Sequence, residues 1–307
     1  MFNIIGETNI DFISKRKLAF LFSGALCVLG LIAAVQVGRG AANLAIEFTG
    51  GTMVQGSFSH PVDPGTLRHL LAEGGFPDAE IQTLESRETP NSFAIRVKED
   101  AAGATQSAQK MVEWIASKLP DNVFTVDSMH EVGPSVGDTL QRQARNAVII
   151  SLVCILVYIW FRFDFRSGVA ATVATFHDVL AVLGILWLLH REISLLIITG
   201  LLTLAGYSLT DTVVVFDRIR ENLKQFRRRS DFAATINKSI NEVLSRTFVT
   251  TLTCQLVVLV LLFFGGDVLF DFALTLFLGF TIGTYSSWFV ASPILVEWEE
   301  RKPSRFK

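Results

Sequence analysis

The chain has 307 residues, of which 50% are hydrophobic and 18% are charged, with a formal net charge of -2. Soluble domains average about 25% charged residues, so this depletion excludes a disordered chain and a nucleic-acid binder with a strong basic field. The three cysteines lie in apolar stretches and are odd in number, which argues against a disulfide framework or a thiolate metal site. A membrane protein is indicated, and the modest mean hydropathy of +0.44 indicates an additional polar domain.

Six apolar stretches are long enough to cross a bilayer as helices, which takes about 20 residues each. The first, 18–37, follows three basic residues and could be a cleaved signal peptide. Its apolar run is longer than the roughly 7–15 residues of a signal core, which favours a retained helix. The polar segment 38–142 comes next, and five further spans fall within 143–296, at 144–163, 167–189, 193–216, 247–264 and 268–294.

The polar segment 38–142 has the pattern of a small α+β domain. Alternating Phe93, Ile95 and Val97 mark a half-buried strand, and apolar residues at helical spacing mark two helices. The β-α-β-β-α-β order is that of a ferredoxin-like fold. The segment has no Ser-His-Asp grouping and no HExxH motif, so an enzyme is not expected. The expected elements are a strand at 44–58, a helix at 64–75, strands at 79–85 and 92–98, a helix at 106–119 and a strand at 123–132.

Lysine and arginine residues are concentrated on one side of the spans. They gather at the two termini, 1–17 and 297–307, and in an expected loop at 217–246, whereas the two short loops on the other side hold only Arg191. Positive charges stay on the cytoplasmic side of membrane proteins. Both termini and the loop are therefore expected in the cytoplasm, and the segment 38–142 outside it.

Ionisable residues inside the spans point to function, because a charge at the bilayer centre costs about 2.5–3.5 kcal/mol on insertion scales. Asp211 lies about five residues, or roughly 7–8 Å, inside the cytoplasmic end of its span. Arg246 begins the next span at a similar depth and is followed by Thr250 and Thr251. An Asp211–Arg246 pair across adjacent helices is therefore expected, either for function or only to specify helix packing.

A second polar pair, His177 and Asp178, lies near the middle of the third span. Adjacent residues are about 100° apart around a helix, so both cannot point along one line. One is expected to face a water-filled path while the other supports packing, and a purely structural role for both is an equal alternative. Gly279, Gly283 and Ser287 are spaced four residues apart and form a small-residue ridge that is expected to pack closely against another helix.

These intramembrane groups have no accompanying nucleotide site. The chain contains no GxxxxGK[ST] motif and no Gly-Lys pair, which excludes a P-loop ATPase. Acid, base and hydroxyl groups inside a membrane, without a nucleotide site, indicate an ion gradient as the energy source, most simply protons. No cofactor and no metal are expected.

Seven short motifs, in the order in which they follow along the chain, resemble those of the SecF family of protein-export subunits. SecF proteins form part of the SecD/SecF family, which belongs to the resistance-nodulation-division superfamily. The resemblance covers nearly the whole chain, with one departure, because Glu47 stands where the family usually has Asp. The segments that carry it are Glu47-Phe48-Thr49-Gly50-Gly51-Thr52, Val132-Gly133-Pro134-Ser135-Val136-Gly137, His177-Asp178-Val179, Gly206-Tyr207-Ser208-Leu209-Thr210-Asp211, Asp217-Arg218-Ile219-Arg220-Glu221-Asn222, Ser245-Arg246-Thr247 and Gly283-Thr284-Tyr285-Ser286-Ser287.

The resemblance implies a subunit that pairs with SecD in the bacterial cytoplasmic (inner) membrane. Such a subunit uses the proton motive force late in export, after preproteins have passed through the SecYEG channel, with YajC and YidC as further partners and no nucleic acid. By motif position it implies Asp211 and Arg246 as proton-relay residues, with Thr250 or Thr251 as hydroxyl neighbours. The matched motif positions also include Glu47, Gly50, Gly51, Gly206, Ser208, Asp217 and Arg218.

Two other functions fit the same features. A stand-alone secondary transporter of the same superfamily would have to act as a homodimer, because such exporters usually have twice as many spans and two extracytoplasmic domains. A non-conducting assembly scaffold would use the polar segment as its interaction module, with the intramembrane charges only specifying packing. Na⁺ in place of H⁺ is a further alternative for the coupling ion.

Overall fold

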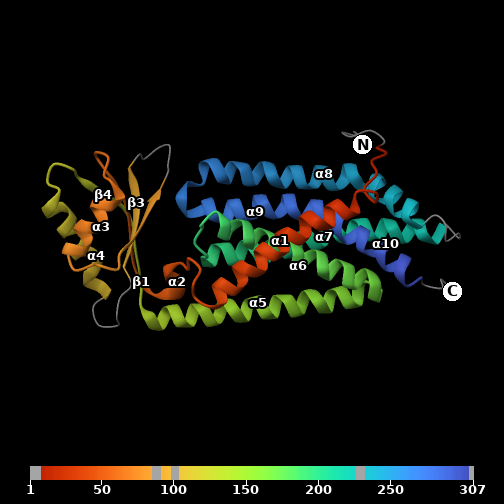
Figure 1. Cartoon of the computed structure of the whole chain (residues 1–307), viewed down its shortest axis with the longest axis horizontal. Coiled ribbons are helices and arrows are strands. Elements are labelled where there is room, and N and C mark those ends of the chain that lie inside the picture. Colours follow the sequence, from red (N-terminus) through yellow and green to blue (C-terminus); the bar gives the residue numbers. More distant parts are fainter. Residues whose placement is uncertain (1–7, 85–90, 98–103, 226–231, 304–307) are drawn as a thin grey trace. The chain divides into compact units, whose positions relative to one another are not determined.

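A computed structural model of the chain describes residues 8–84, 91–97, 104–225 and 232–303. The backbone separates into two compact units (Figure 1). The helical unit comprises residues 1–43 and 147–307, and the α+β unit comprises residues 44–146. A polytopic helical membrane protein with an inserted α+β domain, as predicted, is confirmed.

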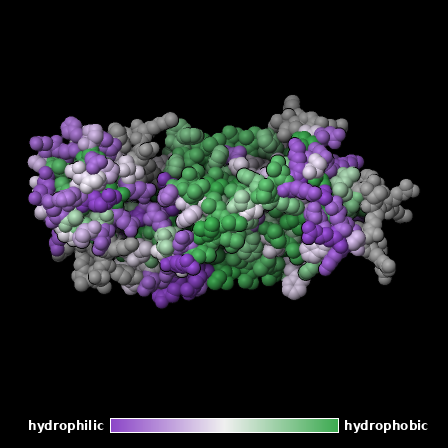
Figure 2. Space-filling view, viewed as in Figure 1, coloured by the Kyte–Doolittle hydropathy of each residue, from purple (hydrophilic) through white to green (hydrophobic). Residues whose placement is uncertain are grey.

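Within the described residues, six helices are long and apolar enough to cross a membrane. Figure 2 shows a hydrophobic band around the middle of the helical unit and hydrophilic residues at the end that holds both termini. The helices are α1 (Arg16–Gly38), α5 (Pro134–Arg162), α6 (Phe165–Leu188), α7 (Leu195–Gln225), α8 (Phe232–Phe264), α9 (Gly266–Ser286) and α10 (Ser292–Arg301). The last span consists of two α-helices, α9 and α10, joined by a π-helical turn at Ser287–Ala291. Pro293, at the start of α10, cannot donate a backbone hydrogen bond.

The expected loop 217–246, which connects two spans, is helical over most of its described residues. Helix α7 continues to Gln225 and helix α8 begins at Phe232. Ile219 and Ile236 are buried in the same hydrophobic cluster, one from each helix. The two helices therefore extend past the apolar spans because their extensions have apolar faces that pack together, which a loop could not provide.

Helices α1 and α6 cross at a pair of glycines. A Cβ atom on Gly184 would lie 2.7 Å from the backbone nitrogen of Gly30, and one on Gly30 would lie 2.1 Å from the carbonyl oxygen of Leu180. These distances leave no room for a side chain, so the two backbones touch at this point, as small residues allow in membrane helices.

We expect Gly30→Val to disrupt the packing of α1 on α6, because the added side chain would collide with backbone rather than with a flexible group. Overpacking of this kind costs about 1–3 kcal/mol or more. The melting temperature of the detergent-purified chain should fall. Gly24→Val on the same helix is the matched control, since nothing lies within 4 Å of its Cβ position. An equal melting temperature for the two variants would contradict this packing.

The predicted small-residue ridge on α9 packs against α7, which confirms its expected packing role. A Cβ atom on Gly279 would lie 3.0 Å from the side chain of Leu204, and one on Gly283 would lie 3.1 Å from that of Ser208. The third member, Ser287, is fully buried and bonds to α7 through Thr212. This close approach brings the polar residues of α7 and α9 within hydrogen-bonding distance of each other.

The α+β unit is a four-stranded antiparallel sheet in the order β2-β3-β1-β4, with two helices packed on one face. This is the ferredoxin-like arrangement that the element order predicts. Its core includes Val54 and Ile95 from the sheet and Leu71 and Ile115 from the helices, all fully buried. Its elements are α2 (Ile46–Thr49), β1 (Gly51–Phe58), α3 (Pro64–Glu73), β2 (Glu80–Leu84), β3 (Ser92–Val97), α4 (Ala104–Lys118) and β4 (Phe124–Val132).

The first predicted strand, 44–58, begins later than expected, because a helical turn, α2, occupies Ile46–Thr49. Gly50 and Gly51, with φ angles of +70° and +120°, end that turn and start β1. These angles lie in a region that favours glycine. Alternation of apolar residues alone could not reveal such a change of direction.

Candidate functional site

Asp211 lies in α7 at a point where α8 and α9 converge, and only 4% of its surface is exposed. Its Oδ2 atom accepts hydrogen bonds from Thr284 of α9 at 3.1 Å and from Thr251 of α8 at 3.5 Å. The two threonine Oγ1 atoms are themselves 2.6 Å apart. Asp211 therefore shares a buried polar cluster with hydroxyl groups from both neighbouring helices.

The hydroxyls around Asp211 form a chain. The Tyr207 hydroxyl donates to Thr251 Oγ1 at 3.1 Å. Since each hydroxyl has a single hydrogen to donate, one ordering satisfies the shorter contacts, with Tyr207 donating to Thr251, Thr251 to Thr284, and Thr284 to Asp211. A chain of this kind provides neighbouring donor and acceptor oxygens along which a proton can be passed to or from the carboxylate.

The predicted ion pair between Asp211 and Arg246 is not formed in this structure. Among the described residues, no ion pair joins them, and Arg246 is exposed on α8 together with Thr250, whose hydroxyl donates to the Arg246 carbonyl at 2.9 Å. Arg246 precedes Thr251 by five residues, which is a rotation of about 140° around the helix. Because Thr251 faces Asp211, Arg246 and Thr250 face away from it. Thr251 is the residue of α8 that lies beside Asp211, and Arg246 is displaced from it by about 7.5 Å along the helix axis as well as by rotation.

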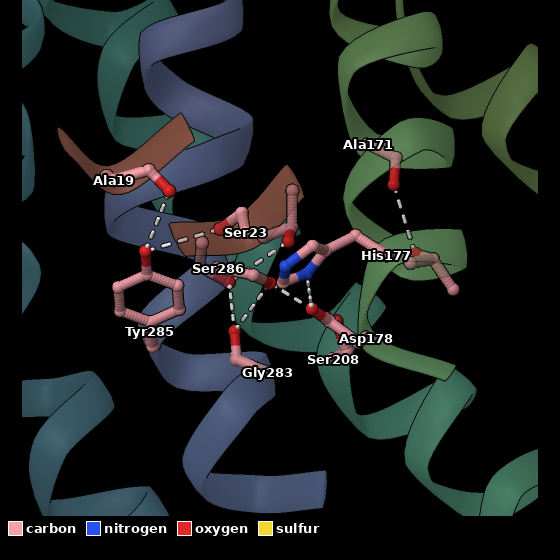
Figure 3. A network of polar contacts seen from close by, with 12 residues as sticks. Ala19, Ser23, Ala171, His177, Asp178, Ser208, Gly283, Tyr285 and Ser286 are labelled. Carbon is pink, nitrogen blue, oxygen red and sulfur yellow. Dashed lines mark hydrogen bonds and ion pairs between the residues drawn. The ribbon is translucent and has the colours of Figure 1, made fainter. Parts of the chain in front are cut away.

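His177 and Asp178 form a second buried cluster, between α6, α7 and α9 (Figure 3). Asp178 has no exposed surface, and its Oδ1 atom is 2.8 Å from His177 Nδ1. Its Oδ2 atom accepts hydrogen bonds from Ser208 of α7 and from Ser286 of α9, the latter at 2.7 Å. The expectation that one of the pair faces a water path while the other packs is not met, because both are buried and bonded to each other. The two residues leave the helix in different directions, but their side chains bend toward each other.

Helix α1 joins this second cluster through the neighbouring residue Tyr285. The hydroxyls of Tyr285 and Ser23 are 3.2 Å apart, and Tyr285 also donates to the carbonyl of Ala19 at 3.3 Å (Figure 3). His177 Nε2 is buried and has no hydrogen-bond partner among the described residues. Polar contacts thus connect α1, α6, α7 and α9 in the membrane-spanning part of the chain.

The two clusters share α7 and α9, and sequence reasoning missed several of their members. Ser208 precedes Asp211 by three residues, and Thr284 and Ser286 lie two residues apart on α9. The sequence motifs contain Thr284, Ser286 and Tyr207 but do not indicate their roles. The signal that could have found them is the grouping of hydroxyl residues next to the Gly279 and Gly283 ridge.

The remaining predicted motif residues lie away from Asp211. Gly206 is exposed on α7, while Asp217 pairs with Arg162 of α5 and Arg218 with Glu242 of α8, the last at 2.7 Å. These ion pairs tie the extensions of α5, α7 and α8 together.

Glu47, Gly50 and Gly51 belong to the α+β unit. A Cβ on Gly137 would lie 3.1 Å from the Gly50 nitrogen, so the motif around Gly50 packs against the motif that follows β4. Burial lowers the pKa of Arg96 in the same unit, and the negative charges of Glu80 and Glu47 oppose that shift. The Glu47 motif therefore has a structural role, since it packs where the chain enters and leaves this unit.

Residues 115–301 match the family model described as protein export membrane protein SecD/SecF, C-terminal. The chain is 47% identical to protein translocase subunit SecF of Thermodesulfovibrio yellowstonii over 298 residues, which cover 96% of this chain and 97% of that one. The chain belongs to the SecD/SecF family. It is also 38% identical to SecF of Endomicrobium trichonymphae over 98% of this chain and 95% of that one.

Members of the SecD/SecF family with solved structures have the same fold. The crystal structure of SecDF, a translocon-associated membrane protein, from Thermus thermophilus matches with a TM-score of 0.83 and 38% identity over 96% of this chain. A second structure of SecDF, in a super-membrane-facing form, matches with a TM-score of 0.66. This chain covers 39% of the first SecDF chain and 40% of the second.

Proposed function

We propose that this chain acts as the SecF subunit in Sec protein export and that Asp211 binds the proton that drives its conformational cycle. The role in export is supported by relatives named SecF at 38–47% identity over nearly the full length. The role of Asp211 rests on one observation, a carboxylate buried in a membrane span with hydroxyl partners and no ion pair among the described residues. The function is transport.

A buried carboxylate without a counter-charge is unstable in a membrane. A proton on Asp211 removes that charge and stabilises the packing of α7, α8 and α9 seen here. Loss of the proton leaves a carboxylate that stabilises a different packing, one that supplies it with a positive charge. An equilibrium between two packings then shifts with the proton occupancy of Asp211. A proton gradient across the membrane would drive the cycle, with Tyr207, Thr251 and Thr284 passing the proton.

Arg246 is the basic residue that we assign to this relay, acting from the exposed face of α8 in the state described here. An arginine facing lipid is costly, so this face requires a partner. The adjacent face of α7 exposes Thr199, Thr203 and Thr210 in a row. Their hydroxyls donate to carbonyls of α7 itself, at 2.8 Å, 2.8 Å and 3.0 Å, so this face is a stripe of small side chains that lets another helix approach closely. We assign both faces to the contact with SecD, which is supported by relatives in which the two names are joined as SecDF.

His177 and Asp178 have a supporting role in this proposal. They hold α6 to α7 and α9 next to the relay, through hydrogen bonds from Ser208 and Ser286. A fixed α6 gives the moving helices a stable surface to pack on.

The same proposal places the chain in the cytoplasmic (inner) membrane of a bacterium, with both termini in the cytoplasm. Ion pairs of Arg16 with Glu297 and Glu300 hold the start of α1 and the end of α10 at one end of the helical unit. Basic residues gather at that end, which supports this orientation by the positive-inside rule. The α+β unit, 44–146, would then be extracytoplasmic and contact emerging preproteins, with SecYEG, YajC and YidC as neighbours.

Copurification with SecD in mild detergent tests two parts of the proposal together. These are the role of the chain as a SecF subunit and the assignment of the exposed faces of α7 and α8 to the contact with SecD. The wild type should recover SecD, and Thr203→Trp should lose it, because the large side chain prevents close approach to the stripe of small side chains. Val157→Trp, on the exposed apolar face of α5, is the matched control and should recover SecD normally. Recovery of a homodimer without SecD would contradict the proposal and favour the stand-alone exporter, which the SecF relatives do not favour.

A further inference from the structure

An apolar cavity of about 410 Å³ lies between α1, α5, α6 and α7. On α6 its lining runs from Thr172 to Leu183, a distance of about 16 Å at 1.5 Å per residue. The hydrocarbon core of a bilayer is about 30 Å thick, so the cavity extends over about one leaflet. Its volume and length describe a long, narrow space.

The cavity offers no polar group to an occupant. Thr172 and Thr175 are the polar residues in its lining, and their hydroxyls donate to the carbonyls of Gly168 and Ala171 on their own helix, at 2.9 Å and 3.0 Å. Both therefore present methyl groups to the cavity. The other lining residues are aliphatic or phenylalanine, so the space suits hydrocarbon and not water.

Helix α5 stands apart from the other spans at this cavity. None of the described helix pairs in extended backbone contact includes α5, whereas α1 packs along α6 and α7 along α9. Leu152 and Ile155 of α5 line the cavity, while Val153 and Val157 are exposed on its outer side. Since α5 is apolar on both sides and spans the membrane, the medium that reaches the gap behind it is lipid.

A positively charged residue, Arg39, lies near one end of the cavity. Val37 lines the cavity near the end of α1, and Arg39 follows it as an exposed residue. Arginine at the end of a span favours the phosphate of a lipid headgroup by charge. An apolar molecule without an anionic group would leave this charge unused.

We propose that this cavity is a binding site for one acyl chain of a phospholipid, with the lipid phosphate at Arg39. The chain fills the gap between α5 and the other helices over about one leaflet. It would keep α5 separated from the remaining spans at the cavity without leaving an empty space, while the ion pair of Arg162 with Asp217 holds the end of α5 to α7. This site goes beyond the proton relay and does not depend on it.

The test uses the full chain, coexpressed with SecD, in nanodiscs that contain phosphatidylglycerol with a photoreactive diazirine in its acyl chain. Peptide mapping after illumination should place crosslinks on the α6 segment 172–183. Leu152→Trp, which fills the cavity, should lose most of these crosslinks. Val153→Trp, one residue further and on the outer face of α5, should keep them. Arg39→Gln should reduce crosslinking by the phosphatidylglycerol probe and by a phosphatidylcholine probe alike, because both lipids carry the phosphate assigned to Arg39.

A second filling variant, Leu183→Trp, guards against misfolding of the first, and size-exclusion profiles confirm that each variant is folded. The proposal is overturned if the wild type crosslinks only on the outer face of α5. It is also overturned if folded Leu152→Trp and Leu183→Trp keep wild-type crosslinking on α6, or if α6 crosslinks to SecD through the cavity instead. None of these readouts requires export activity, so failure of the relay proposal would not affect them.

Discussion

Replacing Asp211 with Asn is expected to stop proton-driven export while leaving the fold intact. The amide keeps the size of the carboxylate, and its oxygen can still accept the hydrogen bond from Thr284, which is 3.1 Å from Asp211 in the wild type. It cannot bind and release a proton, so the two packings would no longer respond to the gradient. The measurement is the rate of preprotein export into membrane vesicles with an imposed proton gradient.

Glu221→Gln is the control for this substitution. Glu221 lies on the same helix ten residues further on, or about 15 Å away along its axis, and its side chain is 62% exposed in a pair with Arg218. An exposed pair of this kind contributes little, so export should continue at the wild-type rate. Wild-type export by the Asp211→Asn variant would show that Asp211 does not carry the coupling.

Replacing Asp178 with Leu is expected to destabilise the helical unit strongly. The substitution leaves His177, Ser208 and Ser286 without their shared acceptor in a site with no exposed surface. Hydrogen bonds between membrane helices contribute modestly one at a time, but several are lost together, so we expect a loss of about 2–4 kcal/mol. Thermal unfolding of the detergent-solubilised chain would show this as a lower melting temperature.

Two further variants separate the role of Asp178 from a general effect of losing a carboxylate. Asp178→Asn keeps an acceptor oxygen and should lose much less stability than Asp178→Leu. Asp164→Asn, at the exposed start of α6, should have a melting temperature close to that of the wild type. If Asp178→Leu melted like the wild type, the cluster would not be the support that we assign to it.

The large features of this chain follow from its residue pattern. A helix occupies each of the six predicted spans, because about 20 apolar residues in a row have few alternatives to a membrane helix. The α+β unit is confirmed because its strands alternate and its helices repeat with different periods. Asp211 stood out because a single acid in an apolar span is rare.

The contacts of the site depend on how helices rotate against one another, which spacing does not determine. Thr251, five residues after Arg246 on α8, occupies the place beside Asp211 that the spacing predicts for Arg246. The rotation of α9 is determined by Gly283, which packs on Ser208 and so directs Thr284 toward Asp211. Each of these contacts depends on the packing of residues that are far apart in the chain. The motifs therefore identify the region of the site but not the hydrogen bonds within it.

The protonation of Asp211 is the central claim, and isotope-edited infrared spectroscopy of the full chain in complex with SecD measures it most directly. We predict a carboxylic-acid C=O band that is lost in Asp211→Asn, remains in Asp178→Asn, and converts to a carboxylate band as the pH is raised. A wild-type spectrum without this band under conditions that support export, or a band unchanged by Asp211→Asn, would contradict the account.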